Sequence, residues 1–112
     1  MEPFVDIVRK GNEAFARGDY ARAIFWYGKA VEAGSGDPLQ MADLYGNMAN
    51  VSAATGQFEK AVDYYQEAVR IFRLEEDYAR LGISFVNIGN VYADQGISAK
   101  ALHFYKQALL LL

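Results

Sequence analysis

Three asparagines recur at one position of a repeated pattern, and their amide groups are suited to hydrogen bonding. They are Asn12, Asn50 and Asn90, each six residues before a glycine. An asparagine side chain carries a carbonyl acceptor and an NH₂ donor, so a row of them matches the alternating N–H and C=O groups of an extended peptide. Alternatively, these three amides hydrogen-bond to neighbouring helices, and the residue pattern leaves both interpretations open.

A second row of polar residues stands nine residues before the same glycines and comprises Arg9, Asn47 and Asn87. Residues three apart lie along one stripe of a helix, so the two rows are neighbours. Asn47 and Asn87 have no evident packing partner, and asparagine is a poor helix former. We therefore expect them to contact a ligand. The predicted binding residues are Arg9, Asn12, Asn47, Asn50, Asn87 and Asn90.

Other residues with chemical potential do not combine into a catalytic or metal site. The chain has no cysteine, and its only histidine, His103, lacks a second ligand at metal-binding spacing. Gly34–Gly36 lacks the lysine and hydroxyl of a phosphate-binding loop. The acidic run Glu75–Asp77 is typical of a helix start, where the helix dipole favours negative charge. We expect a non-enzymatic protein with no cofactor and no metal.

The elements that position these amides repeat with the glycines Gly18, Gly56 and Gly96. Five, nine and twelve residues after each glycine stand an alanine, a tyrosine and another alanine. These steps place them on one face of an α-helix. Seven residues before each glycine stands a small residue, which predicts close approach of a partner helix; the three are Gly11, Ala49 and Gly89. Each copy therefore reads as helix, turn, helix, and six helices are expected.

The repeated residues resemble the tetratricopeptide repeat over essentially the whole chain. The first copy matches through Gly11-Asn12, Gly18-Asp19-Tyr20, Ala23-Ile24, Tyr27 and Ala30, and the other two copies follow it. The resemblance implies an all-α fold, an α-solenoid of three helical hairpins in a right-handed superhelix. The repeats are placed at about residues 3–36, 38–73 and 77–112 of a single domain, 1–112. The first helix of each hairpin is expected to line a concave groove.

The glycines are 38 and 40 residues apart, whereas the repeat usually has a period of roughly 34 residues. The additional residues fall between copies. In the first addition, Asp37 is predicted to cap a helix that begins at Pro38, with Gln40 as its capping-box partner. In the third copy, Ile97-Ser98 replaces the Asp-Tyr or Gln-Phe pair of the other copies.

The resemblance also implies a test for one class of partner. Co-chaperone members of the family hold the C-terminal carboxylates of chaperones with two asparagines and three basic groups. Asn12 and Asn47 match the amide positions, but Val8, Ile83 and Asn87 stand where basic groups are required. Since charge-assisted bonds make such a clamp strong, we do not expect a chaperone-tail acceptor. We expect a groove that binds a peptide segment of a partner protein.

Charge and hydropathy exclude other partners. The chain of 112 residues has 11 basic and 14 acidic residues without a basic block, so no nucleic-acid binding is expected. The longest apolar run, Ala108–Leu112, is too short to span a membrane. The N-terminus lacks the basic start and apolar core of a signal peptide. We expect a cytoplasmic protein.

The leucine run suggests an alternative function, a structural scaffold that assembles with itself. Its residues are Leu109, Leu110, Leu111 and Leu112. Consecutive residues on a helix point about 100° apart, so they cannot all face the preceding helices. Some must meet solvent, another molecule or further repeats. We therefore expect a homo-oligomer or a fragment of a longer array.

Overall fold

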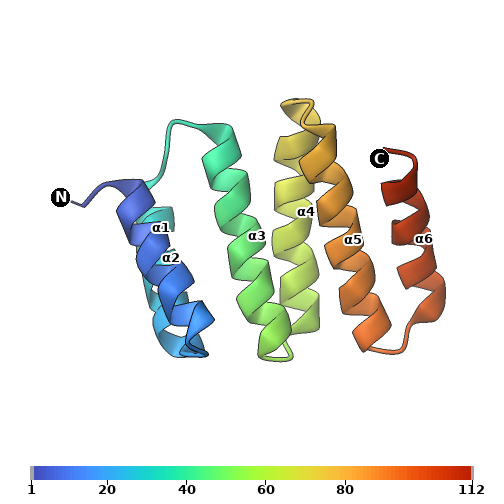
Figure 1. Ribbon diagram of the computed structural model, residues 1–112, viewed down its shortest axis with the longest axis horizontal. Helices are drawn as coiled ribbons and strands as arrows, with labels where there is room; N and C mark the ends of the chain where they lie inside the picture. Colours follow the sequence, from blue (N-terminus) through green and yellow to red (C-terminus); the bar gives the residue numbers. More distant parts are fainter. Residues whose placement is uncertain (1, 112) are drawn as a thin grey trace.

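The computed structural model describes residues 2–111, which form three consecutive helical hairpins lying side by side (Figure 1). No strand is present within these residues, so the predicted all-α solenoid of six helices is confirmed. The helices are α1 (Phe4–Ala16), α2 (Tyr20–Ala33), α3 (Pro38–Ala54), α4 (Phe58–Leu74), α5 (Tyr78–Asp94) and α6 (Ser98–Leu109). The N-terminal and C-terminal helices lie at opposite ends of the stack (Figure 1).

The turn inside each hairpin depends on a glycine in the left-handed region. Gly18, Gly56 and Gly96 have φ angles of 77°, 76° and 76°. Only glycine adopts this conformation without a steric cost from Cβ. The turn folds the chain back at once, because the residue after the glycine donates its backbone N–H to the preceding helix, as Asp19 does to Ala14 at 2.9 Å.

A fourth turn, between α4 and α5, has the same geometry without a glycine. Glu76 occupies the left-handed position with φ 56°, and Asp77 donates its N–H to Phe72 at 2.9 Å. The prediction that the whole run Glu75–Asp77 begins a helix is therefore wrong. Glu75 is the C-cap of α4, and only Asp77 caps the start of α5, accepting a hydrogen bond from the N–H of Arg80 at 3.1 Å.

The connection between α2 and α3 is stabilised by side chains. Asp37 caps α3 by accepting from the N–H of Leu39 at 3.0 Å, and Pro38 is the first helical residue, as predicted. The capping box with Gln40 does not form. Instead, the Ser35 hydroxyl donates to Oε1 of Gln40 at 2.6 Å, and the same hydroxyl oxygen accepts from the N–H of Asp37 at 3.1 Å. Ser35 supplies the acceptor that Gln40 was expected to provide.

The small residues of the first helices allow the close approach that was predicted, and the group that approaches is a tyrosine ring. A Cβ added to Gly11 would lie 2.4 Å from Cε1 of Tyr27, and one added to Gly89 would lie 2.5 Å from Cε1 of Tyr105. Any larger residue would displace the ring. The helix-destabilising glycines, each costing about 1 kcal/mol relative to alanine, are thus explained by packing.

The core consists of two clusters of buried residues. One lies between the first hairpin and α3, and the other fills the space between α3, α4, α5 and α6. Here α4 is longer than α2, with 17 residues against 14, and its additional turn buries Ile71 and Phe72. This packing fixes the first helices α1, α3 and α5 relative to one another, and they carry the predicted binding residues.

Candidate functional site

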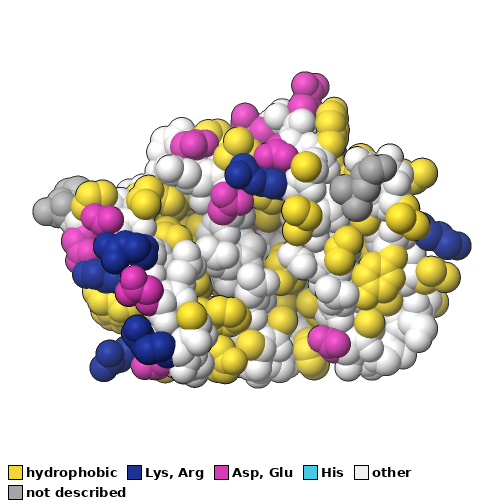
Figure 2. All heavy atoms as spheres, in the orientation of Figure 1, with side chains coloured by type: hydrophobic (Ala, Val, Ile, Leu, Met, Phe, Trp, Pro, Cys, Tyr) yellow, Lys and Arg dark blue, Asp and Glu magenta, His cyan; other side chains and the backbone are white. Residues whose placement is uncertain are grey.

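A cleft of about 590 Å³ lies across the first helices of the three hairpins. Most of its lining residues come from α1, α3 and α5, and α4 contributes Tyr65 and Phe72. Five of the six predicted binding residues line it, namely Arg9, Asn12, Asn47, Asn50 and Asn87; Asn90 does not. Figure 2 shows this face of the molecule, where the surface over the middle of α3 is largely uncharged.

Asn12, Asn50 and Asn90 form the inner row, and each of them accepts a hydrogen bond from the second helix of its own hairpin. The hydroxyl of Tyr27 donates to Oδ1 of Asn12 at 2.6 Å, and that of Tyr105 donates to Oδ1 of Asn90 at 2.6 Å. Tyr65 donates to Asn50 in the same way. These bonds satisfy the hydroxyl group of each tyrosine, so the carbonyl oxygens have a structural role. The NH₂ group of each asparagine is the part available to a ligand.

Arg9, Asn47 and Asn87 form the outer row, and its two asparagines differ from each other. Asn47 donates through Nδ2 to Oδ1 of Asn12 at 3.1 Å, although the sequence indicated no packing partner for it. This bond forms because α1 and α3 lie close enough for side chains 35 residues apart to meet. It leaves the carbonyl oxygen of Asn47 as an acceptor in the cleft. Asn87 is half-buried in the same lining, and its side-chain amide has no hydrogen-bond partner among residues 2–111.

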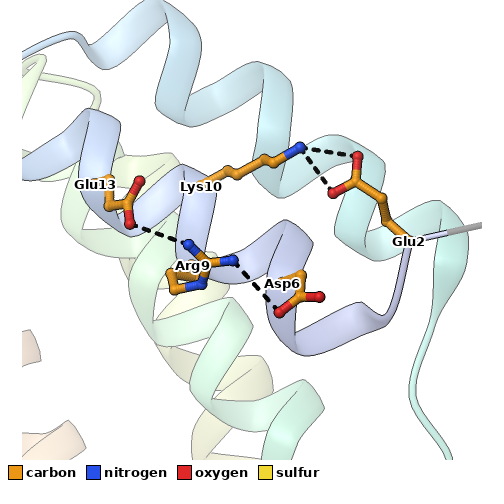
Figure 3. A network of polar contacts seen from close by, with 5 residues as sticks. All are labelled: Glu2, Asp6, Arg9, Lys10 and Glu13. Atoms are coloured by element: carbon orange, nitrogen blue, oxygen red, sulfur yellow. Dashed lines mark hydrogen bonds and ion pairs between the residues drawn. The ribbon is translucent and has the colours of Figure 1, made fainter.

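Arg9 lies at the edge of the cleft within a network of charges on the first helix (Figure 3). Its guanidinium contacts Oε1 of Glu13 at 3.3 Å and Oδ1 of Asp6 at 3.5 Å. Beside it, Nζ of Lys10 contacts Glu2 at 2.8 Å and lies 4.5 Å from the centre of the Trp26 ring. The positive charge of Arg9 is therefore already balanced by two carboxylates before any ligand binds.

Two charged residues of the cleft, Asp43 and Arg80, were not among the binding residues predicted from the sequence. Nε of Arg80 lies 3.9 Å from Oδ1 of Asp43, and Nη1 of Arg80 lies 3.2 Å from Oδ2 of Asp77. Burial raises the pKa of the Asp43 carboxyl; the charge of Arg80 opposes this effect, and the charges of Asp77 and Asp37 add to it. The spacing could have identified Asp43, because it stands four residues before Asn47 on the same helical stripe.

The comparisons with known proteins agree with this architecture. A family model described as the tetratricopeptide repeat matches residues 40–111. The chain belongs to the tetratricopeptide repeat family. The N-terminal domain of stress-induced protein-1 (STI-1) from C. elegans has the same fold, with a TM-score of 0.82 and 23% identity. The match covers 97% of this chain and 84% of that chain. The TPR2AB domain of yeast Sti1, in its pHSP90 complex, gives a TM-score of 0.83 at 27% identity, covering 96% of this chain and 40% of that one.

Curated relatives are similar over part of their length. The STIP1 homolog of Dictyostelium discoideum is 29% identical over 101 residues, which is 89% of this chain and 17% of that protein. The small glutamine-rich tetratricopeptide repeat-containing protein 2 of Mycosarcoma maydis is 32% identical over 81 residues, 71% of this chain and 22% of that protein. This tetratricopeptide repeat chain thus spans less than a quarter of either relative.

The leucine run forms a second surface, on the last helix. Leu109 and Leu110 are 72% and 86% exposed, whereas Leu111 packs against the core. Leu112 lies outside the described residues. Within residues 2–111, no helix is long and apolar enough to cross a membrane.

Proposed function

We propose that this tetratricopeptide repeat chain is a non-enzymatic interaction module that binds a segment of a partner protein in the cleft. The observation that carries the proposal is the convergence of polar side chains from three successive hairpins on one open cavity. Arg9 and Asn12 come from α1, Asn47 comes from α3, and Asn87 comes from α5. A single hairpin presents only part of this surface, so binding depends on the stack.

The amide groups suit the main chain of such a segment. The carbonyl oxygen of Asn47 is free to accept from a peptide N–H, and Asn87 offers both a donor and an acceptor. Each such hydrogen bond contributes about 0.5–1.5 kcal/mol. Several of them, with burial of the apolar lining, give an expected dissociation constant on the order of micromolar.

Strongly acidic tails are poor candidates for this cleft. The pHSP90 complex is a property of the yeast Sti1 domain. In this chain, Val8, Ile83 and Asn87 line the cleft at the positions where the family's carboxylate clamp requires basic groups. The two arginines that line it, Arg9 and Arg80, already contact carboxylates of their own chain. An acidic ligand would have to displace these contacts.

The proposal is tested with peptides selected from a phage-displayed library of random dodecapeptides. Asn47→Ala combined with Asn87→Ala is expected to weaken binding of the selected peptides about tenfold, from the loss of one or two hydrogen bonds. Gln66→Ala, on the exposed side of α4 and outside the cleft, is the matched control. Unchanged affinity in the double variant, with helicity intact by circular dichroism, contradicts binding in the cleft.

A second candidate function, a self-assembling scaffold, is favoured by exposed leucines of α6 and of the turn that follows it. Leu102, Leu109 and Leu110 are all more than half exposed, and burying one leucine stabilises an association by about 1.5–3 kcal/mol. Light scattering over a concentration series is expected to show an assembly that Leu110→Glu dissolves while leaving the helical signal unchanged. A monomer at the highest concentration rules this function out.

A further inference from the structure

A row of three residues follows the outer edge of the cleft, with an acidic residue between two apolar ones. Thirteen residues before the turn glycines stand Val5, Asp43 and Ile83. All three line the cleft, and they come from α1, α3 and α5 respectively. Val5 and Ile83 are each 57% exposed, so both offer uncovered aliphatic surface. The carboxylate of Asp43 therefore stands on the middle helix, with an exposed aliphatic side chain on the helix to either side.

The carboxylate of Asp43 is incompletely neutralised. Among residues 2–111 its one basic partner is Arg80, at 3.9 Å, and Arg80 makes its shorter contact, 3.2 Å, with Asp77. Burial and the charges of Asp77 and Asp37 raise the pKa of Asp43 even though the guanidinium of Arg80 opposes the shift. A further positive charge at this place would be attracted.

The same excess of negative charge occurs at the other end of the cleft. Arg9 is shared between Asp6 and Glu13, as Arg80 is shared between Asp43 and Asp77. Each of the two arginines that line the cleft is thus held by two carboxylates of its own chain. Asp43 is the acidic residue of the lining, and it shares its arginine with a closer carboxylate, so a basic side chain of a bound segment is attracted at this place.

We infer that the partner segment carries a lysine or arginine that meets Asp43, flanked by aliphatic side chains that cover Val5 and Ile83. This inference rests on the proposed function, because it assigns the chemistry of the segment that the cleft binds. A charge-assisted bond to the carboxylate is stronger than a neutral one, and covering the exposed valine and isoleucine adds apolar burial. The asparagine amides hold the main chain, and the row of Val5, Asp43 and Ile83 selects its side chains.

The experiment measures how often each residue type occurs in the dodecapeptides that are selected on the wild-type chain. Lysine and arginine are expected to be enriched over aspartate and glutamate, with aliphatic residues beside them. For a selected peptide labelled with fluorescein, anisotropy is expected to show about five- to tenfold weaker binding to Asp43→Asn, the effect of one partly exposed charge contact. Asp63→Asn, which removes the same charge from the exposed surface of α4, is the matched control and is expected to change affinity less than about twofold.

Charge reversal provides an independent readout. Asp43→Lys is expected to prefer the same peptide with its basic residue changed to glutamate. Acidic enrichment, or equal affinity of Asp43→Asn and the wild type, overturns the inference. If the Asn47/Asn87 double variant still loses binding in that case, the cleft is the site and only the charge assignment is wrong. If no peptide is enriched, or if binding does not depend on those asparagines, the proposed function fails as well.

Discussion

The first and third hairpins share one internal arrangement and differ in their outer surfaces. In both, a tyrosine of the second helix packs on a glycine of the first and donates to the following asparagine. The outer face of α1, however, carries a charged network, whereas the last turn of α6 exposes Leu109 and Leu110 (Figure 3). The packing inside a repeat and the surface at the end of the array are therefore set by different residues.

Counting from the turn glycine shows how the charged face arises. Asp6, Lys10 and Glu13 occupy the positions at which α5 has Ser84, Ile88 and Val91, all of them buried. Burying this ion network would cost desolvation energy. The exposed leucines after the start of α6 carry no charge, so the two ends of the stack differ in surface chemistry.

The largest expected effect is a loss of stability in alkali, and it comes from the buried tyrosines of the first and second hairpins. Burial raises the pKa of Tyr27 and of Tyr65 to about 12 from an ordinary value of 10.0. Since the neutral phenol is favoured in the folded state, this stabilisation is complete below pH 10 and is lost as the pH rises towards 12. The loss is on the order of 2 kcal/mol for each tyrosine.

Urea unfolding at pH 9 and at pH 12 measures this effect. Tyr27→Phe is expected to reduce this pH dependence, because the side chain of Tyr27 is only 2% exposed. An unchanged pH dependence in the variant would contradict this role of Tyr27.

The next effect concerns the glycines beneath these rings. Gly11→Ala is expected to lower the free energy of unfolding by about 2 kcal/mol, because its Cβ would overlap a ring that is fully buried. Gly89→Ala is expected to cost about 1 kcal/mol, since the half-buried ring of Tyr105 has room to shift. Chemical denaturation at pH 7 measures both. If Gly89→Ala is the more damaging variant, the comparison is reversed.

A smaller difference is expected when each tyrosine loses its hydroxyl at neutral pH. Tyr27→Phe removes a partly buried hydrogen bond to Asn12 and is expected to cost about 1 kcal/mol. Tyr105→Phe exposes the oxygen of Asn90 to water, which replaces the bond, and is expected to cost no more than about 0.5 kcal/mol. Thermal and urea unfolding of the two variants give the difference, and the opposite order would contradict it.

The smallest effect concerns the turn that leads into the third hairpin. Asp19-Tyr20-Ala21-Arg22 recurs as Asp77-Tyr78-Ala79-Arg80, but Glu76 replaces the preceding Gly18 at a φ of 56°. Glu76→Gly is expected to raise the free energy of unfolding by about 0.5 kcal/mol, since relief of the left-handed strain slightly exceeds the added chain entropy. Gly18→Ala, the converse change, should lower it by about 1 kcal/mol. Destabilisation by Glu76→Gly would show that the glutamate has another role.

Helices, turns and helix faces could be predicted from the sequence because they depend on residues near each other in the chain. The spacing of Ala23 and Tyr27 after Gly18 is enough to indicate an amphipathic helix after a turn. The two local errors, at Gln40 and at Glu75–Glu76, arose where more than one acceptor or capping residue was available. At those places several local arrangements have similar energies, and packing against the neighbouring helices determines which one forms.

The sequence by itself determined the three hairpins and the stripes that carry the asparagines, because helical periodicity and the need for glycine at a left-handed turn are local requirements. Only the tertiary structure decided how those side chains are used. The bond from Asn47 to Asn12 and the contact between Asp43 and Arg80 join residues on different hairpins. Their formation depends on the distance and rotation between hairpins, which result from the packing of the whole core.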